Sequence, residues 1–116
     1  MEIRIIKEPI TREELKCIAQ ERFRDFVKAV VDVEQGIMAV GGEFHAHEEV
    51  LLMEQEGSKR ENTWGINLFP DISGEEFLEF DSLVNLKPWL GNRSRAVEDA
   101  TIREQIKKIV EKLILS

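Results

Sequence analysis

Apolar residues recur at helical spacing in two stretches, one near each end of the chain. Residues 12–25 are predicted to form an amphipathic helix, whose apolar stripe consists of Leu15, Ile18, Ala19, Phe23 and Phe26. The residues at positions 11 and 14, Thr and Glu, have the spacing of a capping box and mark the start of this helix. A second helix is predicted to begin after Asp99 or Thr101, with a stripe formed by Ile102, Ile106, Ile109, Val110 and Leu113.

Between these helices the apolar pattern changes to the spacing of β-strands. An Ile-rich strand over residues 2–7 precedes the first helix. Five more strands are predicted between the two helices, over residues 27–33, 37–40, 43–53, 63–69 and 77–86. The resulting order, β-α-β-β-β-β-β-α, predicts a single α+β domain over residues 1–116.

In this predicted domain the sheet is mainly antiparallel, and the N-terminal strand–helix unit and the C-terminal helix pack on one of its faces. The apolar faces of the predicted elements supply the core. The residues expected to be mostly buried are Leu15, Ile18, Phe23, Val31, Trp64, Leu68, Phe80, Ile106 and Ile109.

The charge balance narrows the classes of partner. The 116 residues include 16 Lys and Arg against 23 Asp and Glu, a net charge of −7. Long-range repulsion therefore disfavours nucleic acid and anionic lipid. The apolar runs fall far short of the roughly 20 residues that a membrane-spanning helix needs, so no membrane role is expected. The single cysteine, Cys17, cannot form an internal disulfide, and we expect a cytoplasmic location.

The first candidate site is a metal centre formed by Glu43, His45 and His47. These residues occupy every second position, and alternate residues of an extended strand point to the same face. Two imidazoles and a carboxylate can hold a divalent ion such as zinc or iron and leave a coordination position open. The alternative interpretation is a pair of surface histidines beside acidic residues.

The second candidate is a polar face of the sheet. If the strands over residues 63–69 and 77–86 pair, Asn67, Asp81 and Asn85 converge with the histidines on a face that can form the floor of a small-molecule pocket. An antiparallel sheet with helices on one side also has such a hydrated face without any ligand, so both interpretations stay open.

The third candidate is a basic loop in a stretch, residues 82–97, that contains no acidic residue. Its two arginines can bind a phosphate or carboxylate, and the start of the following helix adds free N–H donors. We therefore predict an anion site whose residues are Asn92, Arg93, Ser94 and Arg95, with Asp81 and Asn85 nearby. Alternatively, the arginines pair with carboxylates of the sheet or of the following helix.

Most of the chain resembles a small family of bacterial and archaeal proteins that is grouped as a domain of unknown function. The resemblance implies a single-domain protein of this length and brings no activity with it. The segments that carry it are Lys28–Val33 with Ile37–Glu43, Trp64–Pro70, Phe80–Asn85 and Gly91–Arg95. Similar sequences have Asp at the position of His47, which weakens a site that needs two histidines.

Three functions remain open at this stage. The first is binding of a small anionic or phosphorylated ligand through the loop Gly91–Arg95. The second is a metal-dependent hydrolase or small nuclease that uses Glu43, His45 and His47. The third is an interaction protein, acting as a homodimer or as half of a two-gene pair, because sheet edges need to be covered.

Overall fold

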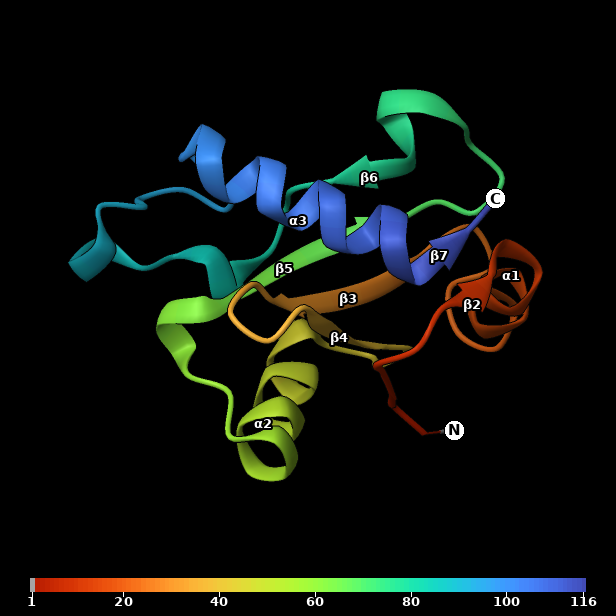
Figure 1. Cartoon of the computed structure of the whole chain (residues 1–116), viewed down its shortest axis with the longest axis horizontal. Coiled ribbons are helices and arrows are strands. Elements are labelled where there is room, and N and C mark those ends of the chain that lie inside the picture. The colour runs from red at the N-terminus through yellow and green to blue at the C-terminus, as the bar shows by residue number, and fades with distance from the viewer. Residues whose placement is uncertain (1) are drawn as a thin grey trace.

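A five-stranded antiparallel sheet forms the centre of the computed structural model, which describes residues 2–116 (Figure 1). Its strands, in spatial order, are β1 (Arg4–Ile6), β4 (Ile37–Val40), β3 (Val27–Asp32), β5 (Thr63–Leu68) and β6 (Leu78–Glu79). Two short parallel strands, β2 (Ile10–Thr11) and β7 (Ile114–Leu115), lie outside this sheet and join the two ends of the chain. The predicted α+β fold with a mainly antiparallel sheet is confirmed.

Helices α1 (Arg12–Gln20) and α3 (Ala100–Leu113) cover one face of the sheet and enclose the main core. The predicted capping box is present at the start of α1, where Thr11 Oγ1 accepts from Glu14 N at 3.0 Å. Asp99 caps α3 by accepting from the amide of Thr101 at 2.7 Å. Both helices therefore begin where local side-chain chemistry predicts, and α1 ends five residues before its predicted end.

Most of the predicted core residues are fully buried in this layer, among them Trp64 and Ile106, which are 1% and 0% exposed. Three of them, Phe23, Phe80 and Ile109, are only half-buried. Within residues 2–116, no helix combines the length and apolar character that crossing a membrane requires.

The predicted strand over residues 43–53 is wrong, because this segment forms helix α2 (His45–Glu56) on the opposite face of the sheet. Its inward residues include Glu48, Glu49 and Leu52, at helical spacing. Two buried glutamates on this face and an exposed Val50 on the other conceal the amphipathic pattern, so apolar periodicity gave no helical signal.

The predicted strand over residues 77–86 is mostly wrong as well. Only Leu78–Glu79 pairs with β5, and Leu83–Asn85 forms a 3₁₀ turn, η3. The side-chain amide of Asn85 takes the place of a further strand, because its Oδ1 accepts from Gly65 N at 2.8 Å and its Nδ2 donates to Gly65 O at 2.9 Å. A side chain at Gly65 would not fit, since its Cβ would lie 2.5 Å from Ser82.

Replacing Ile106 by Ala is expected to lower the free energy of unfolding by about 2–5 kcal/mol, because a fully buried side chain of α3 leaves a cavity against the sheet. Urea denaturation measures this change. The matched control is Ile72→Ala, which alters a 40% exposed side chain and should cost much less. A loss below about half a kcal/mol for Ile106→Ala would contradict the packing of α3 on the sheet.

Candidate functional site: a cavity at the start of helix α2

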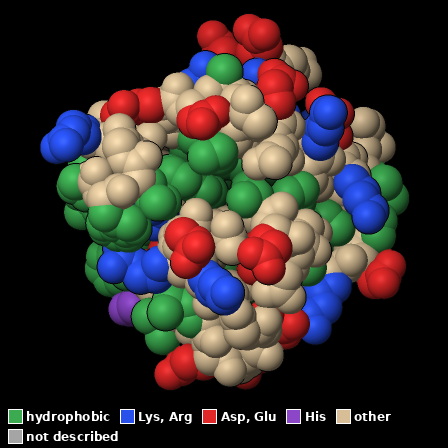
Figure 2. Space-filling model, turned by 60° about the vertical axis from the view of Figure 1, so that its left-hand side comes forward, with side chains coloured by type: hydrophobic (Ala, Val, Ile, Leu, Met, Phe, Trp, Pro, Cys, Tyr) green, Lys and Arg blue, Asp and Glu red, His purple; other side chains and the backbone are tan. Residues whose placement is uncertain are grey.

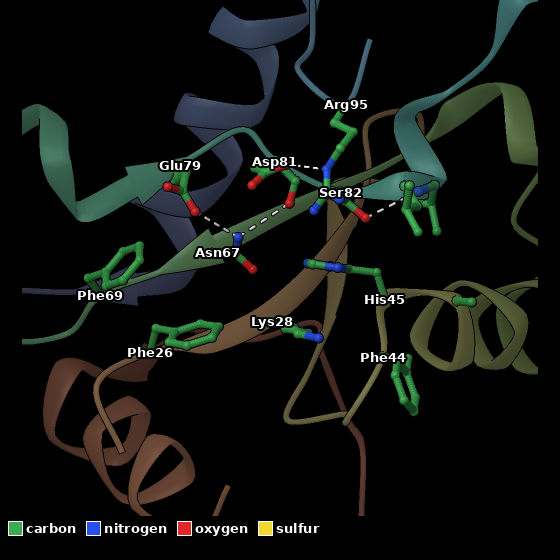
Figure 3. Close-up of a pocket in the computed structure, with 13 residues that line it drawn as sticks. Phe26, Lys28, Phe44, His45, Asn67, Phe69, Glu79, Asp81, Ser82 and Arg95 are labelled. Atoms are coloured by element: carbon green, nitrogen blue, oxygen red, sulfur yellow. Dashed lines mark hydrogen bonds and ion pairs between the residues drawn. The ribbon is translucent and has the colours of Figure 1, made fainter. Parts of the chain in front are cut away.

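A cavity of about 420 Å³ opens on the α2 side of the sheet, and its size suits a small molecule (Figure 3). We call it the α2 cavity. Strands β3 and β5, the first residues of α2 and the segment from β6 to η3 form its walls. The lining residues are Phe26, Lys28, Phe44, His45, Ala46, Asn67, Phe69, Glu79, Asp81, Ser82, Leu83, Val84 and Arg95.

Strand register places three of the polar lining residues in one row across the sheet. Lys28 on β3 pairs with Asn67 on β5, and Asn67 pairs with Glu79 on β6. The residues on either side of Lys28 along β3, Val27 and Ala29, point to the opposite face and are buried in the main core. The alternation of the strands therefore brings a cation, an amide and an anion to the floor of the α2 cavity.

Lys28 is a half-buried cation surrounded by aromatic rings. Its Nζ lies 5.0 Å from the ring centre of Phe23 and 5.3 Å from that of Phe44. Among residues 2–116, no carboxylate lies within ion-pair distance of this ammonium group. Phe26 and Phe69, whose ring centres are 5.4 Å apart, add an apolar wall beside it.

Helix α2 starts at the cavity without a side-chain cap. Its N-cap residue, Phe44, has no side chain that can accept, and the amides of His47 and Glu48 both donate to Phe44 O. The earlier first-turn amides therefore lack a helical partner, and the helix dipole adds partial positive charge there. Lys28 and this helix end bring positive potential to the same side of the cavity.

His45 is held in one tautomer by the edge of β5. Its Nε2 lies 2.8 Å from Ile66 O, and because a carbonyl oxygen only accepts, Nε2 carries the proton. Burial lowers the pKa of His45 below its ordinary value, an effect that the backbone contact with Ile66 only partly opposes. At neutral pH the ring is therefore uncharged, and Nδ1 is an acceptor or weak base.

The amide of Asn67 lies at the centre of the row and is only partly satisfied. Its Nδ2 donates to Glu79 Oε1 at 2.9 Å and to Asp81 O at 3.3 Å. Its Oδ1 is buried and has no hydrogen-bond partner. In Figure 3 this oxygen points away from Glu79 and Asp81, toward the side of the cavity where His45 and Lys28 lie.

A buried carboxyl group, that of Glu48, lies behind the start of α2. The Glu48 side chain is inaccessible to solvent, and its Oε2 accepts from Gly42 N at 2.8 Å, while Oε1 has no partner. Burial raises the pKa of Glu48 well above its ordinary value, against the opposing effects of the Gly42 hydrogen bond and of Lys28. This carboxyl group fixes the Gly41-Gly42 bend from which α2 departs.

The three residues of the predicted metal site do not share a face, because they lie on or beside a helix instead of a strand. Glu43 is exposed and pairs with Arg22 at 3.7 Å. His47 is exposed and packs its ring edge-on against Phe44, with centres 5.2 Å apart, while His45 faces β5. Over residues 2–116, no group of three His, Cys, Asp or Glu side chains is arranged to hold a metal ion.

Several donors of the loop Gly91–Arg95 are engaged within the chain, whereas the exposed guanidinium of Arg93 has no ion-pair partner among residues 2–116. The buried Asn92 amide donates to Asn85 O at 2.7 Å and to Ala96 O at 2.7 Å. Glu98 supplies an internal anion to the same loop, since its Oε2 accepts from Arg93 N at 2.9 Å. Hydrogen bonds from Ser94 and Arg93 lower the pKa of Glu98. The loop therefore binds a carboxylate of the same chain, that of Glu98.

Of the six residues predicted to bind an anion, two line the α2 cavity. Arg95 Nε lies 2.6 Å from Asp81 Oδ1, and this ion pair forms part of the cavity rim. Asn85 lies outside the cavity and is fully occupied by Gly65 and by Arg95 O. Asn67, Asp81 and Asn85 were expected to converge with both histidines on one face of the sheet. Asn67, Asp81 and His45 do line the same cavity, whereas Asn85 and His47 lie outside it.

Sequence reasoning missed Lys28 and the aromatic wall. A usable signal was present: Lys28 interrupts an otherwise apolar strand, Val27–Val31, at a position that must point away from the main core. The phenylalanines gave no signal, because they come from three separate connections that only the tertiary structure brings together.

These features define a single-domain α+β protein with a small, mixed aromatic and polar cavity on the α2 side of its sheet. The chain belongs to the family of proteins of unknown function DUF5674, whose model matches residues 4–113. Comparison with curated proteins and with solved structures finds no match.

Replacing Asn85 by Ala is expected to lower the free energy of unfolding by about 3–5 kcal/mol, because the backbone groups of Gly65 and the carbonyl of Arg95 lose buried partners. Chemical denaturation measures the loss. Asn62→Ala is the control, since Asn62 donates only to Glu34 at the surface. Equal, small losses for both variants would show that the Asn85 amide does not hold the segment from β6 to η3 that forms one wall of the cavity.

The buried Glu48 predicts that stability depends on pH. Because the pKa of Glu48 is raised in the folded state, the contribution of Glu48 to the free energy of unfolding is fully present below the ordinary pKa of 4.5. This contribution is lost as pH rises through the folded pKa. Glu48→Gln, which keeps the shape of the neutral acid, should therefore be more stable than the natural chain at pH 8. At pH 4 the two should differ little. Denaturation curves that give the same difference at both pH values would contradict a protonated Glu48.

Proposed function

We propose that this protein binds a small molecule carrying a carboxylate or phosphate group, and that it does so in the α2 cavity. The single observation that carries the proposal is the position of Lys28. A half-buried ammonium group without a carboxylate partner among residues 2–116 lies beside the uncapped start of a twelve-residue helix. The ammonium group and the start of the helix both carry positive charge, so both stabilise an anion bound between them.

The walls of the cavity support the same proposal. Phe26 and Phe69, which are both half-buried, shield one side from water, and a hydrogen bond or charge pair is stronger where water is excluded. An uncharged His45 can accept a hydrogen bond at Nδ1 without competing for the anion. The anionic ligand expected from the sequence is therefore retained, while its site moves from the loop Gly91–Arg95 to the α2 cavity.

Lys28→Met should weaken the binding of benzoate and of inorganic phosphate roughly tenfold, because it removes the charge and keeps the length of the side chain. Titrations followed by ¹H–¹⁵N NMR give the affinity and should shift the amides of His45 and Ala46. The matched control is Lys108→Met, which removes an exposed lysine of α3 and should change neither.

Two results would contradict the proposal. Shifts confined to the amides of Arg93, Ser94 and Arg95 would return the ligand to the basic loop. Affinities that are equal for Lys28→Met and Lys108→Met would show that Lys28 does not contact the anion.

An interaction function is favoured by a different observation. Leu83, Leu86, Trp89 and Leu90 expose between 37% and 65% of their surface, an uncommon concentration of apolar side chains. Figure 2 shows the hydrophobic side chains that gather on the face of the molecule turned toward the viewer. The expected homodimer and the cytoplasmic location stay predictions.

A further inference from the structure

The row across the floor of the α2 cavity has opposite charges at its two ends. Lys28 and Glu79 are both register neighbours of Asn67, one on each side, so two strand spacings, roughly 10 Å, separate their backbones. Within residues 2–116 neither of them forms an ion pair, either with the other or with a third residue. The cavity therefore contains one unpaired cation and one unpaired anion, at opposite ends.

The Glu79 end offers acceptors. Asn67 Nδ2 donates to Glu79 Oε1, and Arg95 Nε donates to Asp81 Oδ1. The second oxygen of each carboxylate can therefore accept from a ligand. The buried Oδ1 of Asn67, whose residue is only 7% exposed, is a further acceptor without a partner, and it lies in the middle of the row on the side turned toward His45 and Lys28. A group with several N–H donors and a positive charge satisfies this end best.

We infer that the ligand is a small zwitterion, with a carboxylate or phosphate at the Lys28 end, an amine at the Glu79 end, and an apolar or aromatic body between them. This inference rests on the proposed function and specifies its ligand. Phe26 and Phe69 lie along the row and provide a surface for the body of such a molecule. The two charges of the ligand complete two ion pairs that the protein leaves open.

Ligands of other charge fit the row less well. A molecule with anions at both ends meets the carboxylate of Glu79, which has no ion-pair partner among residues 2–116, and like charges at close range repel. A purely cationic molecule leaves Lys28 and the start of α2 without a counter-charge. Complementary charge at both ends also sets the orientation of the bound molecule, which is a source of specificity.

Three probes that share one benzene ring separate these possibilities: benzoate, benzylamine and 4-(aminomethyl)benzoate. We expect 4-(aminomethyl)benzoate to bind about fivefold more tightly than benzoate in NMR titrations, the gain of one partly exposed charge pair. Benzylamine should bind more weakly than either. Glu79→Gln should abolish the advantage of the amine, because a neutral amide gives it no counter-charge, whereas benzoate should bind no more weakly than to the natural chain, since glutamine still accepts from Asn67.

The control variant is Glu75→Gln, which removes an exposed carboxylate outside the cavity and should preserve the advantage. If benzoate binds through Lys28 and the added amine brings no gain, the zwitterion inference is overturned while the proposed function stands. A gain that survives Glu79→Gln overturns it as well. If neither benzoate nor 4-(aminomethyl)benzoate binds, the proposed function itself fails.

Discussion

The side-chain amide of Asn85 is the interaction on which the candidate site most depends. After β6 the chain stops forming a regular strand, and β5 is left with backbone groups that need partners. Asn85 satisfies both groups of Gly65 and also binds Arg95 O, so one side chain joins the sheet, the turn η3 and the basic loop. The wall that includes Ser82, Val84 and Arg95 is held in place through these contacts. Because an amide offers one acceptor and two donors, no apolar residue could replace it.

Helix α2 is attached to the sheet by charged and polar groups as much as by apolar packing. Glu49 accepts from Thr63 Oγ1 at 2.6 Å and lies 3.6 Å from the ammonium group of the fully buried Lys87. Burial lowers the pKa of Lys87, and Glu49 opposes that shift. Such a pair contributes little net stability against an apolar alternative, yet removing one partner leaves a buried charge and is costly. The polar attachment fixes the position of α2, and with it the start of the helix at the cavity.

The unpaired charges of the cavity contrast with the buried ion pair of Glu49 and Lys87. The buried Asn92 amide donates to three backbone carbonyls, and Glu98 accepts from the backbone of the same loop, whereas Lys28 and Glu79 have no ion-pair partner among residues 2–116 and Asn67 Oδ1 has no hydrogen-bond partner. Proteins leave few buried polar atoms without partners, and those that remain often mark functional positions. The contrast between the two regions is why the α2 cavity, and not the basic loop, carries the proposed function.

The sequence by itself determined the elements whose signals are local. Apolar stripes and capping residues placed α1 and α3, period-two alternation placed β3 and β5, and a short apolar run after a turn placed β4, because each depends on neighbours a few residues away. Asn67, Asp81 and His45 were also expected from sequence on one side of the sheet, but Asn85 and His47, expected on the same face, lie outside the cavity, and His45 reaches it from a helix and not from the predicted strand. Tertiary structure alone decided that residues 45–56 form a helix, since the buried Glu49 finds its partners, Thr63 and Lys87, only in distant parts of the chain. It also decided that Asn92 serves the loop and that Lys28 faces a cavity, because a side chain's role depends on which distant groups surround it.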